Sequence, residues 1–154
     1  SKDRLIPDIV RHIYKGNDLS IRNLSAVRPW QHVIEPLFGY MIVAKKLFLG
    51  DKIDQAYNFG PNLDGTSSVS DLIKIINNTT DKNVIYEKDR AIFHETNYLH
   101  LNNSLAKENI GWEPKWNIQE TLNKVLSWYD VYYSAGNIKD FTIKQIEQYE
   151  EIGE

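Results

Sequence analysis

Three arginines are the residues of this sequence best suited to bind an anion. Arg4 stands at the start of a predicted helix, Arg22 at the end of a short predicted strand, and Arg28 in a loop before an apolar helix. A guanidinium donates paired hydrogen bonds to a phosphate or carboxylate, so arginines at the ends of elements can converge on one anion. Spacing alone nevertheless favours the simpler interpretation, which is three separate solvated side chains.

The histidines do not form a metal-binding or catalytic pattern. No H-E-x-x-H occurs, and two of them stand six residues apart, which is the wrong spacing for two ligands on one helical face. We therefore predict no metal site from the four histidines, which are His12, His32, His94 and His100.

The glycines do not form a cofactor loop either. The segment from Gly60 to Gly65 has the two glycines of a triphosphate-binding loop, but Thr66 replaces the lysine of that motif. No G-x-G-x-x-G occurs, and no tyrosine is followed four residues later by lysine. A triphosphatase and a dinucleotide-binding loop are both excluded on these grounds.

Composition limits the class of protein further. The 154 residues contain 18 Lys and Arg against 21 Asp and Glu, a net charge of -3, which lacks the basic excess of a general nucleic-acid binder. The absence of Cys excludes disulfides, thiolate metal sites and cysteine nucleophiles. No apolar run reaches the ~18 residues of a membrane span, and the N-terminus is too polar for a signal peptide. We expect one soluble, cytoplasmic domain over residues 1–154.

The elements that must position these residues are mostly helices. Helical periodicity covers 5–15 and 69–77, and capping boxes at Asn117 and Thr142 predict the start of two later helices. A further helix from Pro36 to about Leu49 is apolar on nearly every side, which predicts burial in a core or against a partner.

Three short segments, 19–22, 56–59 and 84–86, have the composition of strands. Because short strands alternate with helices, the fold class is α/β. The helices outnumber the strands, so we expect a helix-rich fold with an incomplete sheet.

The order of motifs resembles one enzyme family. It comprises Arg4-Leu-Ile-Pro-Asp8, Ile21-Arg-Asn23 and residues 26–40, and it continues through Tyr57-Asn-Phe-Gly-Pro61, His94-Glu95, 99–106, Gly111-Trp-x-Pro114, Trp128-Tyr129 and Gln145-x-x-x-Tyr149. In these residues the chain is similar to the CDP-glucose 4,6-dehydratases, extended short-chain dehydrogenase/reductases that modify nucleotide sugars. The run Arg-Pro-Trp-Gln-His-Val-x-Glu-Pro-Leu is specific to the CDP-glucose branch, whereas Gly-Trp-x-Pro is shared more widely.

The resemblance implies the C-terminal, substrate-binding portion of such an enzyme. The family's cofactor half comes first and carries a Gly-rich loop and a Tyr-x-x-x-Lys pair, both missing from this sequence. In the parent reaction tightly held NAD takes hydride from C4 of the glucosyl group, water leaves across C5–C6, and hydride returns to C6, which gives CDP-4-keto-6-deoxyglucose. Since NAD carries that chemistry, we expect this chain to be catalytically incomplete alone, to hold no NAD and to supply substrate binding.

By position, the resemblance implies a set of substrate-binding residues near the nucleotide. Arg28 matches the arginine that grips the diphosphate. Arg4 and Leu5 match positions that flank the base or ribose, and Ser20 and Arg22 match a second edge on the base side.

Three further residues complete the implied set. Asn58 matches an asparagine that reaches the nucleotide, and His94 lies in a segment that approaches the diphosphate. His32 belongs to the branch-specific run. Each also has a purely structural interpretation: Asn58 could end a strand, and His32 could be a buried, hydrogen-bonded histidine.

Two other interpretations remain open on sequence alone. The chain could be a stand-alone nucleotide-sugar binding or interaction module without enzymatic activity. It could also derive from a related epimerase or decarboxylase, which the CDP-glucose-specific run disfavours. In the leading interpretation we expect self-association, because a strand at 56–59 without its neighbouring sheet would leave an unpaired edge and an apolar face.

Overall fold

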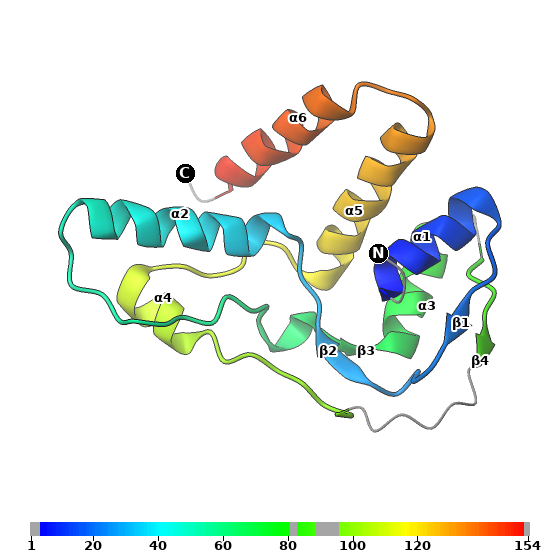
Figure 1. Cartoon of the computed structure of the whole chain (residues 1–154), viewed down its shortest axis with the longest axis horizontal. Coiled ribbons are helices and arrows are strands. Elements are labelled where there is room, and N and C mark those ends of the chain that lie inside the picture. Colours follow the sequence, from blue (N-terminus) through cyan, green and yellow to red (C-terminus); the bar gives the residue numbers. More distant parts are fainter. Residues whose placement is uncertain (1–3, 81–82, 89–95, 153–154) are drawn as a thin grey trace.

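A computed structural model describes residues 4–80, 83–88 and 96–152 of the chain. Helices dominate it, and the strands are two or three residues long (Figure 1). The elements are α1 (Leu5–Lys15), β1 (Ser20–Ile21), β2 (Val27–Pro29), α2 (Ile34–Phe48), a 3-10 turn (Leu63–Gly65), β3 (Thr66–Ser68), α3 (Val69–Thr79), β4 (Glu87–Lys88), α4 (Ser104–Ile110), α5 (Ile118–Tyr133) and α6 (Ile138–Glu150). The predicted helix-rich α/β fold with an incomplete sheet is confirmed.

The strands form two separate pairs. β1 runs parallel to β4, and β2 runs antiparallel to β3 with Arg28 opposite Ser67. The other edge of β2 meets the 97–99 segment, since Val27 N donates to the Asn97 carbonyl at 2.8 Å and Leu99 N to the Val27 carbonyl at 3.1 Å. Pairs this short are not stable alone, so the helices around them must hold them in place.

One hydrophobic core holds α1, β1, α3 and α5 together. These elements lie at the same end of the molecule in Figure 1. Burying each aliphatic side chain contributes about 1.5–3 kcal/mol, so this core is the main source of stability for the part of the chain before residue 30. Its buried residues are Ile9, Leu19, Ile21, Ala26, Val69, Leu72, Ile73, Ile76, Val84, Leu122 and Leu126.

Smaller aromatic clusters join α2 and α4 to the rest. Trp116 and Tyr149 pack edge to face at 5.0 Å between ring centres, with Ile34 beside them. Trp112 is buried against α4 and Phe59. α6 folds back beside α5, so that its last turn reaches the start of α2 (Figure 1).

Several helix boundaries agree with the sequence pattern. α1 has the predicted bounds, and α5 begins at the predicted capping box, in which Asn117 accepts from Glu120 N and Glu120 accepts from Asn117 N. The predicted start of α6 at Thr142 is wrong. The helix begins one turn earlier, capped by Asn137, and the Thr142 hydroxyl instead donates to the Ile138 carbonyl at 2.7 Å.

The predicted strand at 56–59 is also wrong, because the structure gives these residues an irregular conformation beside Trp112 and α4. The strand expected at 84–86 begins three residues further on, as β4. A two-residue pair contributes few ladder hydrogen bonds, so the sequence pattern does not fix its position.

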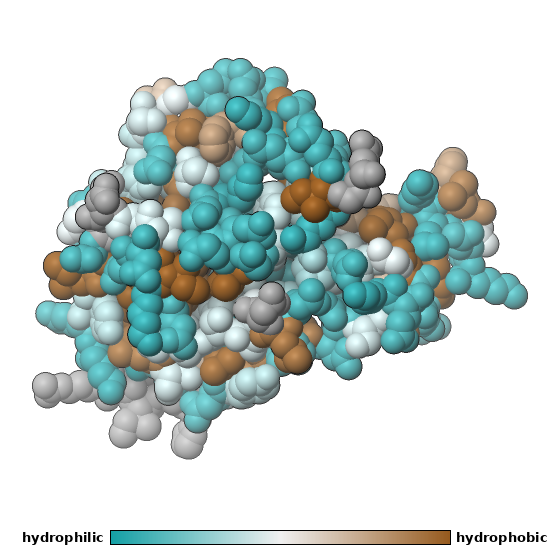
Figure 2. Space-filling model, turned by 180° about the vertical axis from the view of Figure 1, so that it is seen from behind, coloured by the Kyte–Doolittle hydropathy of each residue, from teal (hydrophilic) through white to brown (hydrophobic). Residues whose placement is uncertain are grey.

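α2 is not buried on all sides, as one of its two predicted interpretations required. Ile34, Glu35 and Gly39 are buried, whereas Leu37, Met41 and Phe48 are exposed. Seen from behind, Figure 2 shows hydrophobic atoms gathered at the projecting end of the molecule, where α2 ends. Among the described residues, no helix combines the length and apolarity needed to cross a bilayer.

Candidate functional site

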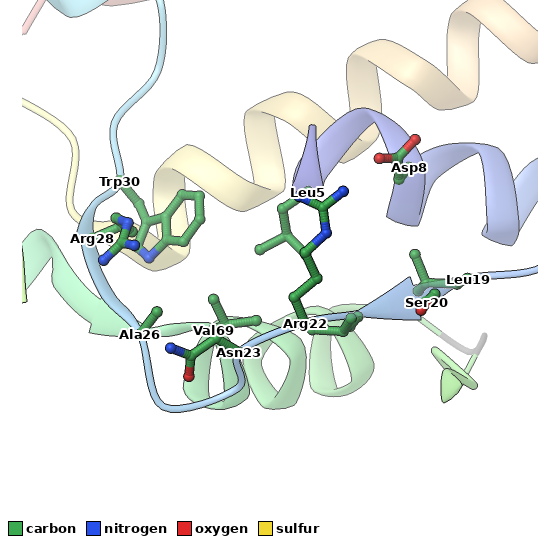
Figure 3. A pocket seen from close by; sticks show the side chains of 11 residues that line it. Leu5, Asp8, Leu19, Ser20, Arg22, Asn23, Ala26, Arg28, Trp30 and Val69 are labelled. Carbon is green, nitrogen blue, oxygen red and sulfur yellow. The ribbon is translucent and has the colours of Figure 1, made fainter. Parts of the chain in front are cut away.

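A cleft of about 290 Å³ lies between α1 and the backbone that runs from β1 to β2 (Figure 3). Its size is at the lower end of the range for small-molecule sites. Both walls come from the first thirty residues, and the floor is closed by the start of α3. The lining residues are Leu5, Asp8, Leu19, Ser20, Ile21, Arg22, Asn23, Ala26, Arg28, Trp30 and Val69.

β2 places Arg28 and Trp30 at one end of the cleft. Trp30 directly follows β2, two residues after Arg28, and the guanidinium and the indole are neighbours in Figure 3. Trp30 is held by the pairing with β3, since its Nε1 donates to the Ser67 carbonyl at 2.9 Å and its amide to the Gly65 carbonyl at 3.1 Å. The Arg28 Nη1 donates to the Val27 carbonyl at 2.9 Å. Both side chains are half-buried, so the cleft has an ordered cationic and aromatic end.

α1 forms the opposite wall. Leu5 and Asp8 are separated by three residues and therefore lie on the same face of the helix. The Asp8 carboxylate accepts a hydrogen bond from Arg11, and both side chains are partly buried. Ile9 and Val10, which are fully buried, fix this helix on the main core.

The polar groups of the cleft follow one another in a row. In Figure 3, Arg28 and Trp30 lie at one side of the view, Arg22 and Leu5 in the middle, and Asp8 and Ser20 at the other side. A cation and an indole at one end, a second cation beside an apolar side chain in the middle and a carboxylate at the far end suit an elongated ligand that has an anionic part.

Asn23 lines the cleft with its amide group already engaged. Its Oδ1 accepts from the Ser25 amide at 3.2 Å and from the Ser25 hydroxyl at 2.9 Å, and its Nδ2 donates to Asn97 Oδ1 at 3.2 Å. These bonds shape the turn between β1 and β2, so this side chain positions the wall.

Four of the residues predicted from the resemblance come together in this cleft. Arg28, Arg22, Ser20 and Leu5 all line it, from three different elements. Arg4 is the exposed N-cap residue of α1, next to Leu5, and does not line the cleft. Their roles in binding stay predictions.

Asn58 and His32 lie elsewhere, and His94 lies outside the described residues. Asn58 is exposed in the irregular segment that follows α2. His32 lines an apolar groove between α2 and α6, packs edge to face on Trp116 at 5.1 Å and accepts from the Ile34 amide at 3.2 Å. Burial, with a smaller effect of Lys124, lowers the pKa of His32 to about 4. This arrangement is that of a neutral, half-buried and hydrogen-bonded histidine.

The sequence interpretation did not single out two lining residues, Trp30 and Asp8. Both carried a signal that could have found them. Trp30 is two residues from Arg28 on a strand, and Asp8 is three residues from Leu5 on a helix, so each shares the face of a predicted site residue.

The glycines at 60 and 65 are packed against the chain itself. A Cβ on Gly60 would lie 2.5 Å from Leu101 Cβ, and one on Gly65 would lie 2.5 Å from Pro61 Cβ. Neither glycine therefore leaves space for a phosphate to approach the backbone. The described residues do not fit NAD, since they provide no open Gly-rich turn between a strand and a helix. Among all the residues that the structure describes, no group of three acidic or histidine side chains could hold a metal ion.

Comparisons with known proteins agree with the resemblance. The chain is 35% identical over 158 residues to a CDP-glucose 4,6-dehydratase of Salmonella typhimurium (strain LT2), a match that covers 97% of this chain and 42% of that enzyme. The chain thus spans less than half the length of the curated relative that it matches. No family model matches the sequence.

Solved structures show the same fold at lower sequence identity. A UDP-glucose-4-epimerase of Stenotrophomonas maltophila, with bound NAD and formylated UDP-arabinopyranose, has a TM-score of 0.74 at 18% identity over 87% of this chain and 41% of its own. A dTDP-glucose 4,6-dehydratase of Bacillus anthracis in complex with NAD has a TM-score of 0.65 at 23% identity over 83% of this chain and 39% of its own. In sequence, this chain therefore corresponds to the C-terminal part of a CDP-glucose 4,6-dehydratase, and its fold is the one that these epimerase and dehydratase structures share.

Proposed function

We propose that the cleft between α1 and β2 binds the nucleotide sugar CDP-glucose for a 4,6-dehydratase. One observation carries the proposal. The resemblance implies Arg28, Arg22, Ser20 and Leu5 by position, and these residues line one cleft together with an ordered tryptophan. If these were four unrelated surface residues, no common cleft would be expected.

The chemistry of the cleft suits a nucleoside diphosphate sugar. Such a ligand brings about two negative charges, and arginines in a half-buried cleft offset the loss of phosphate hydration. Arg28 binds the diphosphate, and Leu5 packs against the ribose or base. The negative net charge of the chain does not oppose this binding, because the attraction is local.

The cofactor and the reacting groups belong to the rest of the enzyme. When bound there, NAD supplies the hydride transfers, while the residues of this chain bind and orient the sugar nucleotide. A stand-alone binding module is less favoured, because 97% of the chain matches a dehydratase of more than twice its length.

In the whole enzyme, the apolar outer face of α2 meets the cofactor-binding portion. On its own, the chain covers this face with a second copy of itself. The support is the run of exposed large side chains, among them Met41 at 62% and Phe48 at 90% exposure. Exposed apolar surface of this kind marks interaction sites.

Calorimetric titration of the chain with CDP-glucose and with CDP tests the proposed site. We expect Arg28→Ala to weaken both by tenfold or more, because hydrogen bonds to charged groups contribute about 1.5–3 kcal/mol. Arg28→Lys should bind with intermediate affinity, since it keeps the charge and loses the paired geometry.

Lys139→Ala, which removes one cation from the exposed face of α6, is the matched control and should bind like the parent chain. Identical titrations for Arg28→Ala and the parent would remove Arg28 from the site.

A further inference from the structure

The cleft contains one group that can tell pyrimidine bases apart. We infer that Asp8 selects cytosine over uracil and thymine by accepting a hydrogen bond from the 4-amino group of the base. This inference rests on the proposed function, and it adds a residue that reads the base.

Position along the cleft is the first argument. If Arg28 binds the diphosphate, the base of an extended nucleotide lies toward the other end. Asp8 and Ser20 stand at that end, on the side opposite Arg28 and Trp30 (Figure 3). Leu5, one turn before Asp8 on the same face of α1, offers an apolar surface to the ring.

The second argument is the chemistry of the neighbouring side chains. Cytosine presents an amino donor at position 4, where uracil and thymine present a carbonyl acceptor. The Ser20 hydroxyl both donates and accepts, so it does not discriminate. Arg22 can only donate, and the acceptor O2 is shared by all three bases, so Arg22 does not discriminate either.

Asn23 has its amide engaged by Ser25 and Asn97 and so offers little to a base. Asp8 is the lining side chain, among those that the structure describes, that can only accept.

The ion pair with Arg11 leaves the Asp8 carboxylate able to accept a further hydrogen bond from the base. Arg11 donates to Oδ1 of Asp8, and a carboxylate has about four acceptor positions on its two oxygens. A 4-carbonyl brought to the same place would set its lone pairs against a negative charge. The Asp8 carboxylate would also be repelled from the N3–H of uracil, because the 2- and 4-carbonyl oxygens lie on either side of that group.

Titration with CDP and UDP, which share their ribose and diphosphate, tests the inference. The parent chain should bind CDP at least tenfold more tightly than UDP. Asp8→Asn should reduce this ratio at least tenfold, because its amide nitrogen can donate to a 4-carbonyl. The change should come from weaker CDP binding, stronger UDP binding, or both.

Two controls separate recognition from structure. Arg11→Gln breaks the ion pair but keeps the carboxylate, so the CDP/UDP ratio should stay high. Glu108→Gln removes one exposed negative charge on α4, and both affinities should stay unchanged.

A parent chain that binds CDP and UDP equally, or an Asp8→Asn variant that keeps the full ratio, would overturn the role of Asp8 and leave nucleotide binding intact. A parent chain that binds neither nucleotide would instead refute the proposed function, and with it the role of Asp8.

Discussion

Glu35 shows how a single buried charge can organise several segments. It is fully buried at the start of α2. Its Oε1 accepts from the backbone amides of Lys115 at 3.1 Å and Trp116 at 2.9 Å, and its Oε2 accepts from the Tyr149 hydroxyl. One carboxylate thus ties α2 to the loop before α5 and to the end of α6. Burial raises the pKa of Glu35, although each of these hydrogen bonds acts in the opposite direction.

Glu35→Ala should lower the free energy of unfolding by about 3 kcal/mol, because it leaves two backbone amides and a buried hydroxyl without partners. Glu35→Gln isolates the effect of ionisation. A raised pKa in the folded state means that the folded chain holds a proton that the unfolded chain has already lost. The stability from this proton is present below the ordinary carboxyl pKa and is lost as pH rises through the raised pKa.

The free energy of unfolding of the parent, relative to Glu35→Gln, should therefore fall in urea titrations as pH rises above the ordinary carboxyl range and through the raised pKa of Glu35. Glu108→Gln, at an exposed position, should show a constant difference from the parent. A difference for Glu35→Gln that grows with pH would mean that the pKa of Glu35 is lowered in the fold.

Sequence could predict the lining residues that a motif places, and it missed those with only a weaker signal. The resemblance places Arg28 and Ser20 by position, whereas Asp8 and Trp30 could be found only from their spacing to Leu5 and Arg28. Glu35 carried no chemical signal in the sequence, because its partners lie 80 to 114 positions away along the chain.

α2 presents an exposed apolar face. Val33, Leu37, Met41 and Phe48 recur at intervals of four and seven residues, which places them on one helical face, and all four are exposed. The sequence predicted that α2 is apolar, but it could not predict whether this face is buried in the core or exposed. Burial in a core and burial against a partner give the same pattern.

Replacing Met41 and Phe48 together by lysine should abolish self-association of the chain, because it sets one positive charge in the middle of the apolar face and one at its end. Light scattering over a range of concentrations measures the result: the parent chain should grow in mass with concentration, and the variant should stay monomeric.

Ile85→Lys is the control, since Ile85 is 72% exposed in the segment before β4, away from α2 in Figure 1. It should self-associate like the parent. A parent chain that stays monomeric at every concentration would show that α2 does not pair with a second copy.

The helices with a strong local signal were predictable, and the segments that depend on distant partners were not. α5 has its capping box and α1 its amphipathic pattern, so both begin at the expected residues. Residues 56–59 have the composition of a strand but pack irregularly here, since within the described chain no strand lies beside them. Strand formation requires a neighbour, and that information is not local.

At the scale of the whole molecule, the cleft and the exposed apolar surface rest on different hydrophobic clusters. The large core around α1, α3 and α5 carries the cleft, so the residues that we propose to bind substrate stand on the part with the most buried aliphatic side chains. The aromatic clusters around α2 and α4 instead position an apolar surface. Under our proposal, the first part holds the nucleotide sugar and the second meets the cofactor-binding portion.

The most direct test of this account is the set of backbone amide NMR signals that move when CDP-glucose is added to the isotope-labelled chain. We expect the largest chemical-shift changes in residues 5–9 and 19–30, on the two walls of the cleft, and small changes in α2, α4 and α6. Changes concentrated in the groove between α2 and α6, or no changes at millimolar CDP-glucose, would contradict the assignment of the cleft as the nucleotide-sugar site.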